Sequence, residues 1–202
     1  MKNDDVEILE RIPAYRGYGR IDQYRLRHRL HRGGMGNPID REVYDRGHVS
    51  GVLPYDPDRD CVVMIEQFRV GAYLAGMRPW QTETVAGIID QGESAEAVAL
   101  REAKEEANLD VSDLIPICRY AVSPGALTET VALFAGRVDS RNAGGIHGLP
   151  EEGEDIKVTV VPVTELAGMI EDGRIGNSLT IIAVQWLLLY RDKLRASWKA
   201  AG

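Results

Sequence analysis

Three glutamates cluster near the middle of the segment "AGIIDQGESAEAVALREAKEEANLD" (86–110), at Glu102, Glu105 and Glu106. On a helix, residues i and i+4 lie one above the other and residue i+3 is adjacent, so these carboxylates would share one side. Like charges at this spacing destabilise an exposed helix by roughly a few tenths of a kcal/mol per pair. Carboxylate oxygens are also ligands for Mg²⁺, often together with substrate phosphates. The segment is therefore either a solvated acidic face or a site for a divalent cation.

The local signals around these glutamates favour a helix between strands. Ser94 is a plausible N-cap, Glu96 lies in the first turn, and alanine and leucine fill the body. Before it, "CVVMIEQFRV" (61–70) predicts a buried strand, "AYLAGMRPW" a loop, and "QTETVAG" a strand ending at Gly87. After it, "IPICRYAVSPGALTETVALFAGRV" predicts two strands around a Ser-Pro-Gly turn.

The rest of the chain predicts further strands and helices. A strand is expected at 156–161, a helix from about Val163 and a final amphipathic helix from about Asn177. "DQYRLRHRL" alternates strictly, which indicates a strand with one basic face. We expect residues 1–45 to form a small β segment and residues 46–202 the main domain. Without a regular βαβ repeat, the fold class is α/β (α+β), with helices packed on a mixed sheet.

Composition and charge limit the possible partners. The chain has 202 residues, 44% hydrophobic and 27% charged, with a formal net charge of −7. This charge argues against a nucleic-acid partner, but not against an anionic substrate if a metal ion stands between it and the protein. The longest apolar run, 179–190, is shorter than the ~20 residues of a membrane span. We therefore expect no membrane partner and a cytoplasmic protein.

The chain has two cysteines, each in an apolar stretch. Cys61 lies in "CVVMI" and Cys118 in "LIPICRY", and neither has the paired spacing of a zinc site. We expect both to be reduced core thiols. The alternative, a mutual disulfide in an exported protein, is not favoured by the N-terminal sequence, which lacks the basic and apolar regions of a signal peptide.

The residues that flank the glutamates resemble the Nudix box, G-x5-E-x7-R-E-U-x-E-E-x-G-U, where U is aliphatic. The matching residues are Gly87, Glu93, Arg101, Glu102, Glu105, Glu106 and Leu109. The chain departs from the pattern at two positions. Ala103 is smaller than the usual aliphatic residue, and Asn108 replaces a glycine that ends the helix in a left-handed conformation, for which asparagine is the next best residue.

The resemblance to Nudix hydrolases implies a fold, a cofactor and a set of roles. The fold would be an α/β/α sandwich with a mixed sheet, and the cofactor Mg²⁺, for which Mn²⁺ can substitute. The implied metal ligands are Glu102, Glu106 and the carbonyl of Ala86. Glu105 would be a further ligand or catalytic carboxylate, and Arg101 would orient the carboxylates. Glu93 would brace the loop or serve as a plain cap.

The sequence outside the box resembles the bacterial ADP-ribose pyrophosphatase subgroup over nearly the whole chain. Pro124, in "SPGALTET", lies fifteen residues after Leu109, at about the spacing of that subgroup, although Ala126 stands where a second glycine often follows. Alone, "SPG" would be an ordinary turn. The resemblance implies substrate-binding roles for Tyr18 (stacking on adenine), Arg41 and Arg69 (phosphates), Ser123, Pro124 and Glu129. The alternatives are a strand-edge tyrosine at Tyr18 and solvated arginines.

The acidic loop "EEGED" is a solvated charge run or, by the resemblance, the carrier of the general base. Glu152 is the implied base, and Glu154 is a further metal ligand or the alternative base.

The implied reaction is hydrolysis of a nucleotide sugar, ADP-ribose, to AMP and ribose 5-phosphate. The alternatives are another sugar nucleotide such as GDP-mannose, or a non-catalytic nucleotide-sensing module. A homodimer is expected. The number of metal ions and the phosphorus attacked stay open.

Overall fold

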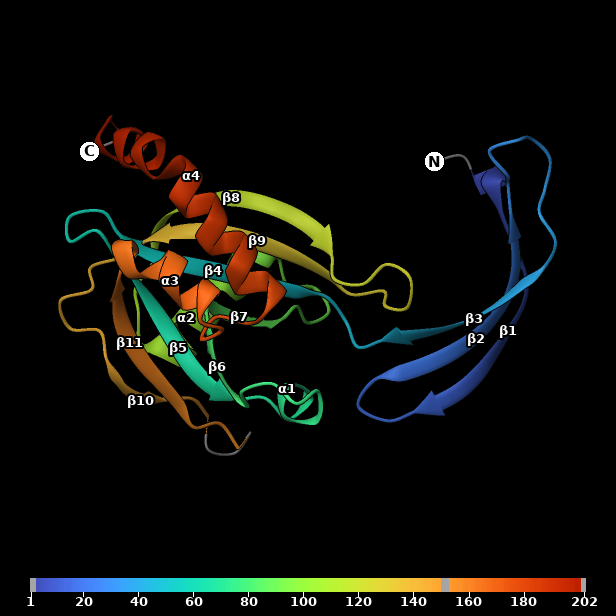
Figure 1. The fold of residues 1–202 in the computed structure, drawn as a ribbon, viewed down its shortest axis with the longest axis horizontal. Helices are drawn as coiled ribbons and strands as arrows, with labels where there is room; N and C mark the ends of the chain where they lie inside the picture. The colour runs from blue at the N-terminus through green and yellow to red at the C-terminus, as the bar shows by residue number, and fades with distance from the viewer. Residues whose placement is uncertain (1–2, 150–152, 201–202) are drawn as a thin grey trace. The chain divides into compact units, whose positions relative to one another are not determined.

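The computed structural model describes residues 3–149 and 153–200 of the chain (Figure 1). Its helices and strands are, in order, η1 (Asn3–Asp5), β1 (Val6–Arg16), β2 (Arg20–His28), β3 (Ile39–Asp45), β4 (Val49–Asp56), β5 (Cys61–Phe68), α1 (Val70–Leu74), β6 (Trp80–Glu83), β7 (Val85–Ile88), α2 (Ala95–Ala107), β8 (Ser112–Ala121), β9 (Thr130–Arg137), β10 (Gly145–His147), β11 (Ile156–Pro162), η3 (Val163–Glu165), α3 (Leu166–Glu171) and α4 (Ser178–Ala200).

The chain divides into two compact units. The smaller unit comprises Met1–His48 and Ala121–Thr130, and the larger unit comprises Val49–Tyr120 and Val131–Gly202. The division expected from the sequence, 1–45 and 46–202, did not anticipate that residues 121–130 would group with the N-terminal strands. That these two segments are domains that fold or act separately stays a prediction.

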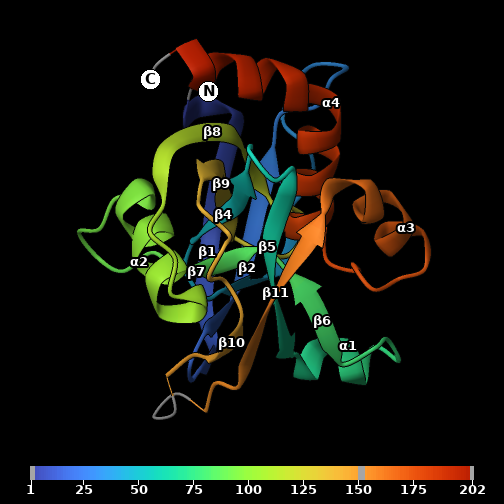
Figure 2. The ribbon, with the colours of Figure 1, turned by 90° about the vertical axis from the view of Figure 1, so that its left-hand side faces the viewer.

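The larger unit has a central mixed sheet between two layers of helices. In the described residues the strand order is β10-β11-β5-β4-β9-β8, with β6 paired to β5 and β7 to β4. β4 and β9 are parallel, and β4 pairs antiparallel with β5 and β7. Helix α2 covers one face of this sheet, and α3 and α4 cover the other (Figures 1 and 2). This is the α/β/α sandwich that the resemblance to Nudix hydrolases implied.

The two faces of the sheet form two hydrophobic cores, because successive residues of a strand point to opposite sides. Leu53 of β4 and Met64 of β5 belong to the cluster that contains the buried residues of α3 and α4. Their neighbours Val52 and Val63 belong to the cluster that contains Ala99, Ala103 and Ala107 of α2. Strands buried on both faces explain the unbroken apolar run at 61–65.

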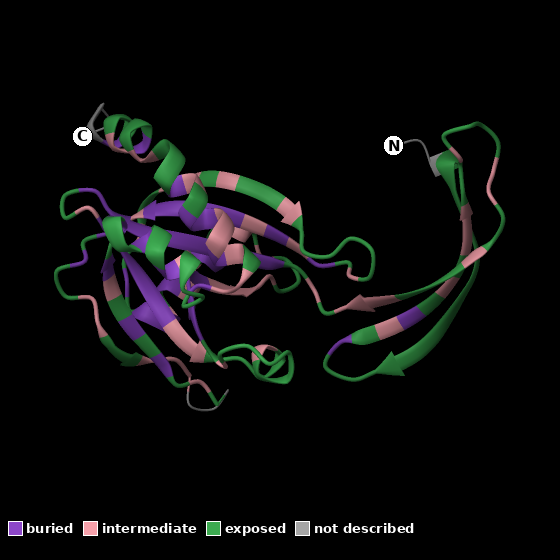
Figure 3. Cartoon of the chain, in the orientation of Figure 1, coloured by how far each residue is buried: buried purple, intermediate pink, exposed green. Residues whose placement is uncertain are grey.

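The smaller unit is a three-stranded antiparallel sheet, β1-β2-β3. Within this sheet Asp22 is buried, and its carboxylate accepts hydrogen bonds from Arg11 (Nε, 2.9 Å) and Arg16 (Nη2, 2.5 Å). These bonds hold the pKa of Asp22 below its ordinary value, against the effect of burial. Every residue of β1 is exposed (Figure 3). The segment 121–130 is attached to the end of β3, since Tyr44 N–H donates to the Ala126 carbonyl (2.9 Å).

Three local predictions were wrong. The expected loop after β5 contains the short helix α1, which has no buried residue and therefore no amphipathic pattern to reveal it. The expected strand at 81–87 is two strands, because β6 pairs with β5 and β7 with β4. Cys61 is buried, but Cys118 is exposed, because outward-facing residues alternate along the edge strand β8.

The C-terminal helix begins where the sequence indicated. Asn177 Oδ1 accepts the N–H of Thr180 (2.9 Å), and α4 follows from Ser178. This capping bond fixes the start of the helix that covers one face of the sheet. No helix among the described residues has both the length and the hydropathy required of a membrane span.

Candidate active site

Helix α2 carries the acidic cluster, and capping fixes its register. Ser94 is the N-cap as predicted, and its Oγ accepts the N–H of Ala97 (3.1 Å). At the other end Asn108 is left-handed (φ 50°, ψ 39°), and its N–H donates to the Lys104 carbonyl (3.0 Å). Asn108, which stands where the box has glycine, thus adopts the left-handed conformation expected there and ends the helix.

Substitution of Asn108 tests this account of the helix end. Asn108→Ala should lower the free energy of unfolding by about 1 kcal/mol, since alanine resists the left-handed region more strongly than asparagine. Asn108→Gly should change it by no more than ~0.5 kcal/mol, because glycine adopts this conformation readily. Urea denaturation of both variants is the measurement. Equal loss in the two would contradict a conformational role for this position.

The carboxylates of α2 lie at the edge of its buried face. Ala103, at the position where the box prefers a larger aliphatic residue, is fully buried against the sheet. Glu106 is only 3% exposed, and its Oε2 accepts the N–H of Ala86 in β7 (3.1 Å). Glu102 lies against Gly87: a Cβ atom on that glycine would be 1.7 Å from Glu102 Oε1. The box glycine therefore leaves room for a carboxylate.

Arg101 is the centre of the polar network around α2. Its Nη1 donates to Glu102 Oε1 and to Glu105 Oε2, both at 2.9 Å, and its Nε lies 3.3 Å from Glu93 Oε1. Glu93 Oε2 also accepts the N–H of Asp90 (3.1 Å). Glu93 thus links the loop before the helix to Arg101, while Ser94 is the N-cap. This geometry suits the orienting role implied for Arg101 and the bracing role implied for Glu93.

Burial dominates the electrostatics of the two inner carboxylates. It raises the pKa of Glu106 well above the ordinary glutamate value, and the charge of Glu102 adds to the increase. Burial also raises the pKa of Glu102, although Arg101 acts in the opposite direction. The pKa of Arg101 is itself raised: burial would lower it, but the neighbouring carboxylates outweigh that effect. Ionising Glu102 and Glu106 together is unfavourable without an additional cation.

A divalent cation fits these residues chemically. Glu106 is a buried carboxylate next to a second carboxylate, and oxygen donors of this kind suit Mg²⁺. The side chains do not already form a finished site, since no three His, Cys, Asp or Glu residues within 3–149 and 153–200 are arranged to hold a metal ion. Arg101 Nη1, which bridges Glu102 and Glu105, supplies positive charge there instead.

The acidic loop approaches α2 through Glu154. The charge of Glu154 contributes to the raised pKa values of both Glu102 and Glu106, as expected of a nearby carboxylate. Its Oε2 accepts the N–H of Leu149 (3.0 Å), and its own N–H donates to the Leu149 carbonyl (3.2 Å). The residue implied as general base, Glu152, lies outside the described residues.

Arg69 is held by a carboxylate that sequence reasoning did not select. Its Nε and Nη2 both donate to Glu83 Oε2, at 2.9 and 2.7 Å. The Glu83 side chain is 12% exposed and that of Arg69 is 44% exposed. The signal for Glu83 was available, since it is a charged residue inside the strand-forming stretch "QTETV". A buried charge in a strand requires a partner.

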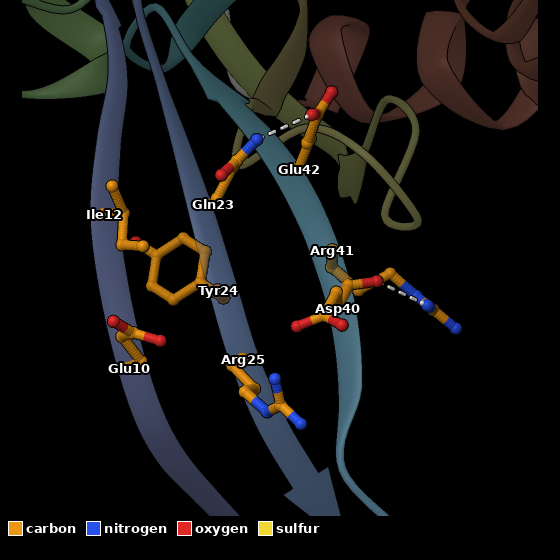
Figure 4. Close-up of a pocket in the computed structure, with 8 residues that line it drawn as sticks. All are labelled: Glu10, Ile12, Gln23, Tyr24, Arg25, Asp40, Arg41 and Glu42. Atoms are coloured by element: carbon orange, nitrogen blue, oxygen red, sulfur yellow. Dashed lines mark hydrogen bonds between the residues drawn. The ribbon is translucent and has the colours of Figure 1, made fainter.

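The other substrate-binding candidates all belong to the smaller unit. Tyr18 is 82% exposed and lines a pocket of about 380 Å³ with Arg16, Arg20 and Arg46. Arg41 lines a different pocket of about 390 Å³ on β1, β2 and β3, where its Nη1 donates to the Asp40 carbonyl (Figure 4). Tyr18 and Arg41 thus belong to separate pockets.

The segment 121–130 holds the remaining three candidates. Ser123 forms a turn, since its carbonyl accepts the N–H groups of Ala126 (3.0 Å) and Leu127 (2.9 Å), and Pro124 within it is exposed. Glu129 is 5% exposed and pairs with Arg46, at 2.5 Å from Nε and 3.0 Å from Nη2. Arg46, which sequence reasoning did not select, therefore balances the charge of Glu129. The substrate-binding roles of all three stay predictions.

The fold and the site define an α/β/α domain built around a carboxylate-rich helix. Residues 45–180 match the family described as NUDIX domain, which is more than half of the chain. The chain belongs to the Nudix hydrolase family, as the Arg-Glu-x-x-Glu-Glu segment of α2 indicated.

Named relatives are similar over most of the chain. The ADP-ribose pyrophosphatase of Escherichia coli (strain K12) is 46% identical over 195 residues, covering 96% of this chain and 93% of that protein. The ADP-ribose pyrophosphatase of Haemophilus influenzae is 41% identical over 198 residues, covering 96% and 91%. The GDP-mannose pyrophosphatase of Citrobacter koseri is 36% identical over 149 residues, covering 73% and 76%.

A solved structure has the same fold at low sequence identity. It is titled "Crystal structure of ADP compounds hydrolase" and superimposes with a TM-score of 0.72, covering 95% of this chain and 97% of that chain at 18% identity. The likeness supports the fold, a mixed sheet combined with helices.

Proposed function

We propose that this Nudix hydrolase cleaves the pyrophosphate of ADP-ribose to AMP and ribose 5-phosphate, with Mg²⁺ as cofactor. The observation that carries the reaction type is the pair of carboxylates on α2, the partly buried Glu102 and the buried Glu106, which suits a hard cation. For the substrate, the support is the 46% identity over 96% of the chain to an ADP-ribose pyrophosphatase. Similarity to a GDP-mannose pyrophosphatase is lower and covers less of the chain.

Divalent metal dependence is general among enzymes of this kind. In this chain Glu102, Glu106 and the Ala86 carbonyl would hold the ion, with Glu105 and Glu154 as candidates for further ligands. When bound, the metal neutralises phosphate charge and lowers the pKa of the attacking water. Mn²⁺, also a hard cation, is expected to substitute.

The protein's own groups then have separate tasks. Arg101 keeps Glu102 and Glu105 in place through its bonds at 2.9 Å. A base on the acidic loop, Glu152 in our proposal and Glu154 in the alternative, takes the proton from water. Arg69 and Arg41 would contact phosphate, Tyr18 would stack on adenine, and Ser123, Pro124 and Glu129 would line the substrate-binding surface.

Product analysis tests the proposal. ADP-ribose and GDP-mannose are incubated in parallel with the protein and Mg²⁺ in H₂¹⁸O. The products are separated, and their masses are measured by mass spectrometry. AMP and ribose 5-phosphate, with turnover of ADP-ribose far above that of GDP-mannose, would support it, and the labelled product identifies the attacked phosphorus. Preferred turnover of GDP-mannose would keep the reaction type and reject the substrate.

We also propose a cytoplasmic homodimer in which Tyr18 and Arg41 of one protomer serve the site of its partner. The support is the exposed strand β1, whose apolar side chains Val6, Ile8, Leu9, Ile12 and Tyr15 are 44–59% exposed. An apolar strand at a sheet edge is a surface that proteins usually cover.

The dimer is tested by light scattering. The wild type should have twice the mass of one chain at micromolar concentration, and Ile8→Asp/Ile12→Asp should shift it toward one chain, because charge would be buried in the interface. An Asp4→Lys variant, outside the apolar stripe, should remain a dimer. A fully active monomeric wild type would rule out both the dimer and a site shared across it.

A further inference from the structure

We propose that Glu83 is a positioning residue, which keeps the Arg69 guanidinium available for the substrate's pyrophosphate and away from the metal-binding carboxylates. This inference rests on the proposed function of Arg69 as a phosphate contact. It adds Glu83, the last residue of β6, to the residues on which the reaction depends.

The backbone of Arg69 is fixed, but its side chain needs a partner. Arg69 N–H donates to the Pro79 carbonyl (2.8 Å), and the Arg69 carbonyl accepts the N–H of Tyr73 (3.1 Å). A half-exposed arginine side chain with several rotatable bonds is not ordered by these bonds. The two bonds to Glu83 Oε2 order it, and a largely buried carboxylate makes them stronger than a surface ion pair.

Glu83 is itself rigidly placed. It pairs with Ile65 across the β5–β6 ladder, and the next residue, Thr84, is buried with its N–H bonded to Thr180 Oγ1 (3.0 Å). Two residues further along, Ala86 N–H holds Glu106. One short segment of chain therefore fixes both the carboxylate that orients Arg69 and a carboxylate of the proposed metal site.

Arg69 and Glu106 are linked through one short stretch of chain, since Glu83 bonds the Arg69 guanidinium and Ala86, three residues further on, bonds Glu106. The positive charge of Arg69 also opposes the rise in the pKa of Glu106 that burial causes. We expect an Arg69 guanidinium released from Glu83 to be attracted to the α2 carboxylates, where it would compete with Mg²⁺. The bonds to Glu83 use two of the five N–H donors of the guanidinium, one on Nε and one on Nη2. The remaining N–H groups, on Nη1 and Nη2, can bind two phosphate oxygens side by side.

The test is a double-mutant cycle with Glu83→Gln, Arg69→Ala and the double variant, using steady-state kinetics with ADP-ribose. Glutamine keeps the size of the side chain and removes its charge. We expect Glu83→Gln to raise KM about 10-fold, a change of ~1.4 kcal/mol. The double variant should have the KM of Arg69→Ala, since a residue that acts through another adds nothing once that other is gone. Additive effects, or a wild-type KM in Glu83→Gln, would overturn the inference.

The Mg²⁺-dependent rise in Tm gives a second readout that needs no substrate. Glu83→Gln should weaken Mg²⁺ binding about 10-fold. In the double variant Glu83→Gln/Arg69→Ala, Mg²⁺ binding should return to the wild-type strength, while the KM for ADP-ribose should stay high. A merely structural role for Glu83 predicts no such restoration. Glu66→Gln is the matched control, because Glu66 on β5 also pairs with an arginine, Arg78 (2.9 Å), but is more exposed.

Two further outcomes are distinguishable. If the wild type does not turn over ADP-ribose, the proposed function fails, and the Tm readout still decides the role of Glu83. If Glu83→Gln does not fold, Glu83→Asp carries the test: it keeps the charge but shortens the reach by one methylene, so KM should rise less than in Arg69→Ala. An unchanged KM and unchanged Mg²⁺ binding in Glu83→Asp would then overturn the inference.

Discussion

Glu106→Gln is expected to abolish most of the activity and, in metal-free buffer, to make the protein more stable. Glu106 is 3% exposed and close to the charge of Glu102, which raises its pKa together with burial. An acid whose pKa is raised by folding disfavours the folded state at pH values above its ordinary pKa, so replacing it by glutamine, which can keep the hydrogen bond from Ala86, should stabilise the fold by about 1 kcal/mol at neutral pH. For a chain of this size, that is a rise of roughly 2–4 °C in Tm.

When Mg²⁺ is added, the Glu106→Gln variant should become less stable than the wild type. The wild type should gain about 2.7 kcal/mol at a metal concentration of 100 Kd, because only the folded state binds the ion. The variant should gain far less, and its kcat should fall by at least ~10²-fold. The measurement is the Tm of both proteins by calorimetry, in EDTA and in Mg²⁺, together with their rates of ADP-ribose hydrolysis. Equal Mg²⁺ stabilisation of the two proteins would show that Glu106 is not a ligand.

The sequence predicted the larger unit well because its signals are local and strong. Alternation in β5 is masked by burial on both faces, yet the continuous apolar run at its start still indicated a buried strand. Ser94 and Asn108 marked both ends of α2, because capping depends on a few residues close in the chain. These elements indicated a mixed sheet with helices packed on it, and the resemblance to Nudix hydrolases implied the α/β/α order of its layers.

What the sequence could not supply are features set by partners far along the chain. The break at Thr84 arises because β6 and β7 join different strands, and its N–H bonds to Thr180. The pairing of Glu129 with Arg46 joins residues 83 positions apart, and no local pattern specifies it. Glu83 is a different case: its charge inside a strand-forming stretch signalled that it needs a partner, but the sequence did not identify that partner as Arg69.

Gly87→Ala is expected to lower activity strongly with little effect on folding. The backbone at Gly87 is not left-handed, so alanine is conformationally acceptable there. The new Cβ would stand 1.7 Å from Glu102 Oε1 and 2.1 Å from Glu102 Cδ, so the carboxylate must move. Because these are atoms of a flexible side chain, the strain is relieved by rotating Glu102 rather than by shifting the sheet.

The cost then falls on catalysis, since misplacing a reactive group by about 1 Å can lower the rate ~10²-fold. We expect kcat to fall by about this factor and the free energy of unfolding to change by less than ~1 kcal/mol. Gly168→Ala in α3 is the control, because a Cβ there meets no atom within 4 Å. It should leave kcat unchanged. Full activity in Gly87→Ala would mean that the position of Glu102 seen here is not the one used in the reaction.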